Sequence, residues 1–215
     1  GNVNYHFGAG YQSETGIYKG DAMERFNLKG SIDSRINDYI SAGLSFNGAY
    51  TNNRTIDDTA VGSAFRLNPL CRAYDDDGEI ILYPGKSASL GTDGDQFTGT
   101  ANPLLDLVNS KYSTKKYQVL ANLYLELRPV KDVVFKTTFS PSYTSYRQGY
   151  MVGYENPNNP GMTYDDSDLS ASETQLTKSS SFSWTWDNIV NYNTTIAKDH
   201  SLGIMGLISA TSGNT

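Results

Sequence analysis

Strict alternation of apolar and polar side chains is the feature of this 215-residue chain that most constrains its fold. In residues 3–11, alternate positions are apolar or aromatic, and the positions between them hold polar side chains or glycine. Successive side chains of a strand point to opposite faces, so a period of two indicates a strand with one apolar and one polar face. The pattern recurs in residues 26–36, 40–51, 117–128, 133–143 and 182–192, and less regularly in 202–210. The sequence therefore predicts seven strands.

The connections between these strands alternate in length. They comprise residues 13–23, 37–39, 52–113, 129–132, 147–178 and 193–199, and every second one is short. In an antiparallel meander this rhythm places the long connections at one end of the sheet. Outer-membrane barrels have this asymmetry, with short periplasmic turns and long outer loops. We therefore expect an all-β antiparallel meander that forms part of a large transmembrane β-barrel with long extracellular loops, the first of which holds a short helix at residues 58–68.

The composition is compatible with this fold and excludes others. The chain has no run of about 18 apolar residues, so no transmembrane helix is predicted. Barrel strands average out as polar because lipid-facing and lumen-facing side chains alternate, which fits a hydrophobic content of 38%. The net charge of −6 argues against nucleic-acid binding, which requires clustered Lys and Arg. The single Cys71 excludes an internal disulfide framework.

Tyrosines gather near the expected strand ends. Amphipathic rings are favoured where hydrocarbon meets headgroups and form aromatic girdles there. The alternative is that tyrosine is simply a good strand former. The expected girdle residues are Tyr11, Tyr50, Tyr143 and Tyr146 on the loop side, and Tyr39 and Tyr192 towards the turns.

We also expect the chain to be a piece of a longer polypeptide. It opens directly in strand-like sequence, without the basic and apolar regions of a signal peptide. Seven is an odd number of strands, whereas bacterial single-chain barrels close with an even number. Residues 1–215 are therefore interpreted as part of a barrel domain whose signal peptide, plug domain and C-terminus lie outside this chain.

Several stretches, in their order, resemble the SusC/RagA-like TonB-dependent outer-membrane transporters. Residues 10–19 (GYQSETGIYK) with 24–28 (ERFNL) are similar to a family hairpin. Residues 64–70 (AFRLNPL), 74–78 (YDDDG) and 102–104 (NPL) resemble its loop segments, and 181–188 (SFSWTWDN) resembles a family strand.

This resemblance implies a role in transport and a set of partners. It implies TonB-dependent nutrient uptake across the outer membrane of a Gram-negative bacterium, without enzymatic activity or cofactor. The partners would be membrane lipid, a SusD-like surface lipoprotein that lids the barrel, and TonB-ExbB-ExbD acting through the plug region. The expected cargo is an oligosaccharide, with peptide import by the same mechanism as the alternative.

Aromatic residues of the two longest connections are the candidate contacts to substrate or partner. Long loops are often functional, and these rings could stack on sugars or, alternatively, pack the loops against one another. The candidates are Tyr74, Tyr83, Phe97, Tyr150, Tyr154 and Tyr164.

Other sites are weakly indicated. The run from Asp75 to Glu79 could attract a cation, but it lacks the spaced ligands of a calcium loop, so an acidic turn is the preferred interpretation. His6 and His200 have no ligand partner at suitable spacing, so no metal site is expected.

Two other functional classes are alternatives. A soluble secreted β-sandwich that binds carbohydrate would bury the apolar faces against each other. An outer-membrane barrel enzyme would need a catalytic set that the sequence does not show.

Overall fold

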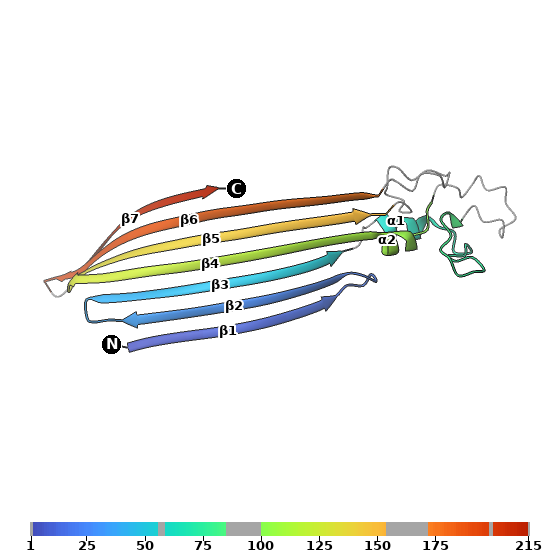
Figure 1. Ribbon diagram of the computed structural model, residues 1–215. Helices are drawn as coiled ribbons and strands as arrows, with labels where there is room; N and C mark the ends of the chain where they lie inside the picture. Colours follow the sequence, from blue (N-terminus) through green and yellow to red (C-terminus); the bar gives the residue numbers. More distant parts are fainter. Residues whose placement is uncertain (1, 56–58, 85–99, 154–171, 198–199, 215) are drawn as a thin grey trace.

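The computed structural model describes residues 2–55, 59–84, 100–153, 172–197 and 200–214. Each strand pairs antiparallel with the next along the chain, so the strands follow one another in a single meander sheet (Figure 1). This confirms the predicted fold class. The elements are β1 (Asn2–Thr15), β2 (Ala22–Arg35), β3 (Ile40–Thr55), α1 (Thr59–Arg66), α2 (Leu104–Asn109), β4 (Ser110–Val130), β5 (Val133–Val152), β6 (Glu173–Ile196) and β7 (His200–Asn214).

The two ends of the sheet differ as expected. The short turns that join β2 to β3 and β4 to β5 lie at one end, on the left of Figure 1, together with the paired residues Ile196 and His200 of β6 and β7. Helices α1 and α2 lie at the opposite end, together with the described parts of the longer connections. Helix α1 confirms the short helix predicted for residues 58–68. No helix within the described ranges is long and apolar enough to cross a membrane.

The strands extend further into the long connections than the sequence indicated. We expected connections at residues 52–113 and 147–178, but β3 continues to Thr55, β4 begins at Ser110, β5 ends at Val152 and β6 begins at Glu173. The expected boundaries were wrong because the alternation fades there. Where both faces of a sheet meet water, polar side chains are acceptable on either face, while the backbone still pairs. Strands of 20 to 24 residues, such as β5 and β6, exceed the roughly 9–11 needed to span a bilayer.

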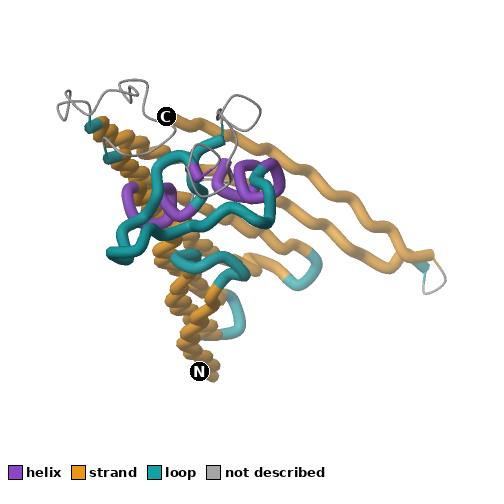
Figure 2. The backbone as a smooth tube through the Cα atoms, turned by 90° about the vertical axis from the view of Figure 1, so that its right-hand side faces the viewer, coloured by secondary structure: helices purple, strands orange, loops and turns teal. Residues whose placement is uncertain are grey.

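The sheet is a single curved layer (Figure 2). The register brings the apolar positions of neighbouring strands into common rows, for example Ile32, Leu44 and Leu123. These side chains are exposed, and the fully buried apolar residues of the described chain lie instead around the loop end, at Ala60, Ala101, Leu105 and Val152. A β-sandwich needs a second sheet over the apolar face. The described part of the chain forms one sheet, so the sandwich interpretation was wrong.

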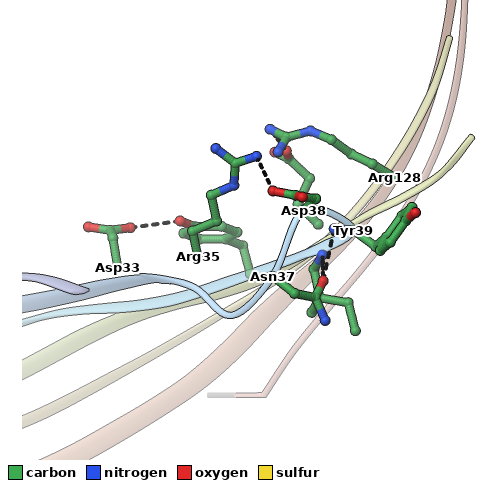
Figure 3. A network of polar contacts seen from close by, with 9 residues as sticks. Asp33, Arg35, Asn37, Asp38, Tyr39 and Arg128 are labelled. Carbon is green, nitrogen blue, oxygen red and sulfur yellow. Dashed lines mark hydrogen bonds and ion pairs between the residues drawn. The ribbon is translucent and has the colours of Figure 1, made fainter. Parts of the chain in front are cut away.

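The turn between β2 and β3 shows how the short connections are built. The Asn37 side-chain oxygen accepts hydrogen bonds from the backbone N–H groups of Tyr39 and Ile40, at 2.8 and 2.9 Å (Figure 3). Asn favours such turns because its side chain can replace a backbone acceptor. The Tyr39 carbonyl in turn accepts a 2.7 Å bond from the backbone N–H of Arg128 on β4. The turn is therefore tied to the neighbouring hairpin, which fixes the register.

Candidate functional site: the polar face and the loop end of the sheet

The polar face carries a contact network that spans five strands. The Tyr124 hydroxyl donates a 2.8 Å hydrogen bond to Asp33, two strands away. The Lys136 ammonium lies 4.7 Å from the centre of the Tyr124 ring, within the range of a cation–π contact. Further along the same face, Ser209 donates a 2.5 Å bond to Asp187. Hydroxyl groups from other strands thus hold the carboxylates of Asp33 and Asp187.

Sequence reasoning did not single out Tyr124 or Asp33, because they lie 91 positions apart along the chain. The register explains their approach: both face Gly43 of β3, which sits between them. A Cβ atom at Gly43 would come within 2.3 Å of the Tyr124 ring and 2.6 Å of the Asp33 carboxylate. A glycine inside a strand often marks a close approach of this kind. Gly43 was therefore the sequence signal that could have indicated the contact between Asp33 and Tyr124.

Neutral hydrogen-bonding groups make up much of the remaining polar face. Asn122 donates a 3.0 Å bond to Ser140, and the hydroxyls of Thr185 and Thr211 lie 3.3 Å apart. Among the residues that the structure describes, no three His, Cys, Asp or Glu side chains are grouped so as to hold a metal ion. The polar face therefore combines hydroxyl and amide groups with charged side chains such as Asp33, Lys136 and Asp187.

The apolar face has a row of aromatic rings on the loop side. Tyr11 contacts Phe26 with ring centroids 4.6 Å apart, and Tyr50 contacts Tyr117 at 4.7 Å. The register aligns the four rings across β1 to β4. Tyr143 shares this face, where it pairs with Val119 and Phe182, and Tyr192 lies on it near the turns, opposite Val133.

Two of the expected girdle residues lie elsewhere. Tyr146 pairs with Lys116 and belongs to the polar face, where its hydroxyl donates a 2.9 Å bond to Gln148. Placing Tyr146 in the girdle was therefore wrong, because one position along a strand reverses the face. Tyr39 lies in the β2–β3 turn and is 63% exposed.

A small buried core joins the loop segments at the end of the sheet. Asn102 is 1% exposed, and its amide nitrogen donates to the carbonyls of Ala73 and Ile81 at 2.8 and 3.0 Å. Its side-chain oxygen accepts a 3.1 Å bond from the backbone N–H of Leu104, at the start of α2. One amide thereby connects residues 102–104 to Ala73 and Ile81, which lie on either side of residues 74–78.

The acidic segment 75–79 is a turn held by its own side chain. Asp75 accepts hydrogen bonds from the backbone N–H groups of Asp77 and Glu79, at 3.0 and 2.8 Å. Gly78 has a φ of 87°, a conformation that glycine adopts without steric cost. Asp76 pairs with Arg72 at 2.7 Å. These contacts support the acidic-turn interpretation.

The predicted aromatic contacts fall into three groups. Tyr74 is 49% exposed at a short β-bridge with Ile80, and Tyr83 is half-buried. Tyr150 lies on β5 and not in a loop. The remaining three, Phe97, Tyr154 and Tyr164, lie outside the described residues.

Tyr150 belongs to a polar-face cluster at the projecting end of the sheet, beyond the length that a bilayer requires. Its ring stacks on Tyr112 of β4, with centroids 5.7 Å apart. Its hydroxyl donates a hydrogen bond to the Glu173 carboxylate, which raises the pKa of Tyr150. The strands therefore hold this ring in a fixed position at the loop end of β5.

The chain is similar to known proteins in sequence and in fold. The TonB-dependent receptor P26 of Formosa agariphila is 23% identical over 206 residues, which cover 95% of this chain and 19% of that receptor. The structure of the RagAB peptide transporter matches with a TM-score of 0.68 at 17% identity, over 98% of this chain and 24% of that one. The 'closed-closed' and 'open-open' states of the RagAB peptide importer match with TM-scores of 0.67 and 0.63. No family model matches the chain.

The fold is that of a section of the RagA β-barrel. The expected resemblance is confirmed as similarity in sequence to a TonB-dependent receptor and similarity in fold to the RagA barrel. The chain spans about a fifth of the length of the receptor and about a quarter of the RagA chain. TonB-dependent receptors reside in the Gram-negative outer membrane, which is the location expected from the sequence.

Proposed function

We propose that this section of a RagA-type barrel belongs to a TonB-dependent importer of the outer membrane. The observation that carries the proposal is the difference between the two faces of the sheet. One face has uncovered rows of large apolar side chains, bordered by aromatic rings, and the other carries hydrogen-bonded polar groups. Only a wall with lipid on one side and water on the other satisfies both faces.

The loop end of the sheet faces the outside and contacts a SusD-like surface lipoprotein. A groove of about 360 Å³ opens there between α1, α2 and the β1–β2 connection. Phe65 and Tyr18 in its lining are 86% and 46% exposed. Exposed aromatic side chains beside a groove are typical anchors for a protein partner. The buried Asn102 contacts hold the adjoining segments in place, so this surface is formed before the partner arrives.

Energy for uptake would come from TonB-ExbB-ExbD acting on a plug domain inside the complete barrel. The polar face of this section would form part of the wall around that plug. Its ordered contacts, such as the bond from Tyr124 to Asp33, keep the wall rigid while the plug moves. Its hydroxyl and amide groups keep the lumen hydrated.

The cargo is a polar oligomer, and an oligosaccharide is the first candidate. Tyr74 and Tyr150 lie towards the outer end, where rings can stack on sugars, and neutral groups on the polar face suit hydroxyl-rich molecules. Peptide is the second candidate, because RagAB is a peptide importer with the same barrel fold.

The test uses the host organism and the complete gene. Deletion of the gene should abolish growth on one class of nutrient, offered as labelled oligosaccharides or labelled peptides, and removal of TonB should reproduce the defect. The protein should fractionate with outer membranes and require detergent for release. Recovery in the soluble fraction, or uptake that is independent of TonB, would contradict the proposal.

A further inference from the structure

Three basic side chains lie directly beside one another on the apolar face of the sheet. In the register, Lys115 of β4 faces Arg147 of β5, and Arg147 faces Lys178 of β6. All three are exposed. They belong to the same face as Tyr117, which lies two positions from Lys115 towards the centre of the sheet. The cluster thus lies just outside the aromatic row, on the surface that faces lipid.

This arrangement is unfavourable unless an anion is present. Neighbouring strands are about 4.8 Å apart, and like charges in directly opposite positions destabilise a sheet. Among the described residues, none of the three forms an ion pair within 4.0 Å. The acidic residue of the same row is Glu24, which lies beyond Asn52 and accepts a 3.4 Å bond from it. The cluster therefore offers three positive charges to an external ligand.

An apolar groove adjoins the cluster on its membrane side. It has a volume of about 600 Å³, and its lining includes the rings of Tyr50 and Tyr117. Gly48 opens the groove, because a Cβ atom there would meet only the Leu28 carbonyl oxygen, at 3.8 Å. A chain of methylene groups would bury apolar area in this groove. The groove and the cluster meet along β4, where Tyr117 follows Lys115 on the same face.

We propose that Lys115, Arg147 and Lys178 bind the phosphorylated headgroup of an outer-leaflet glycolipid of the lipopolysaccharide type, with an acyl chain in the adjoining groove. The inference rests on the proposed orientation, in which this face meets lipid and the loop end lies outside. Arg binds phosphate through a planar fork and Lys as a point charge, so the row can hold an anion with several oxygens. The lipid would neutralise the repulsion within the row and fasten the projecting strands to the membrane surface.

The test compares lipid retention by the full-length protein purified from outer membranes. The variant K115Q/R147Q/K178Q removes the cluster, and R25Q/K29Q/K116Q removes the same charge from the polar face as a matched control. Since the first variant removes all three positive charges that would hold the phosphates, it should retain at least roughly tenfold less phosphorylated glycolipid than the wild type, measured by native mass spectrometry. The control should retain as much as the wild type.

A second variant tests the groove. G48L fills the groove without changing charge, and it should lower glycolipid retention while leaving the cluster intact. The amount of folded barrel, measured by heat-modifiable mobility, must match the wild type for each variant compared. The single variant K178Q gives a milder test if the triple variant folds poorly.

The remaining outcomes separate the possible ligands and the two proposals. Equal glycolipid retention by the wild type and the cluster variant would refute the inference. Binding of inorganic phosphate that depends on the cluster, without an effect on glycolipid, would also refute it and assign the cluster to a free anion. A soluble protein without outer-membrane association would refute the proposed function itself. An outer-membrane protein with unchanged lipid retention would refute the lipid site alone.

Discussion

The hydroxyl of Tyr124 on β4 donates a 2.8 Å hydrogen bond to Asp33 on β2, across the intervening strand β3. The bond passes over Gly43, where any larger residue would meet both partners. A contact between strands that are not neighbours stiffens the sheet perpendicular to its strands. In a barrel wall, this is the direction in which the cross-section of the barrel could deform under an applied force.

Substitution of Gly43 by alanine should therefore destabilise the barrel. The new methyl group would overlap the Tyr124 ring and the Asp33 carboxylate, so the hydrogen bond should break, at a cost of about 1–3 kcal/mol. G48A is the matched control, because a Cβ atom at Gly48 has open space. Denaturant titration of the refolded full-length protein should show a lower midpoint for G43A only. Equal midpoints would show that the bond carries no stability.

The assignment of the faces can be tested with two adjacent residues of β3. Leu44 shares the apolar rows with Ile32 and Leu123, whereas Ser45 lies on the polar face opposite Ser31. An arginine on the lipid face near the bilayer centre costs roughly 2–4 kcal/mol, while lumen positions tolerate charge. L44R should reduce the amount of folded protein in outer membranes, and S45R should leave it near the wild-type level. The reverse ranking would invert the faces.

Asn102 should be the most sensitive polar residue of the loop end. N102A removes two donated hydrogen bonds and one accepted bond at a buried position, and each unsatisfied partner costs about 1–3 kcal/mol. The segment around residues 73–81 should then become accessible to limited proteolysis, while the strands remain protected. N68A is the control, because Asn68 caps only Leu70 and is more exposed. Unchanged cleavage in N102A would contradict the role of this amide.

Substitutions of Asp75 can distinguish two roles for this residue in the acidic turn at residues 75–79, which are holding the turn and binding a cation. If its oxygen only holds the turn, D75N should preserve the fold, because an amide oxygen can accept the same two hydrogen bonds, whereas D75A should loosen the turn. Hydrogen exchange of the Asp77 and Glu79 amides measures both effects. If calcium increases the protection of these amides in the wild type but not in D75N, Asp75 would instead be part of a cation site.

Particular residues show which features of the structure could be predicted from the sequence. The rows built from Ile32, Leu44 and Leu123 were predictable, because each strand alternates by itself and burial in lipid leaves no other choice of face. Tyr146 was assigned to the wrong face, because one position along a strand reverses the face. Tyr150 was assigned to a loop, because the alternation fades near the end of β5. The contact between Asp33 and Tyr124 could not be predicted, because it depends on the register of two hairpins.

The sequence by itself determined the strands, their two faces and the end at which the long connections gather. These properties are local, since they follow from the spacing of side chains along one strand. The tertiary structure alone decided which side chains meet across strands. The row of Lys115, Arg147 and Lys178 spans three strands and 63 positions of sequence, and Asn102 bonds backbone carbonyls 29 and 21 positions away. Such meetings depend on pairing register, which backbone hydrogen bonds and turn geometry fix between strands and no single strand encodes.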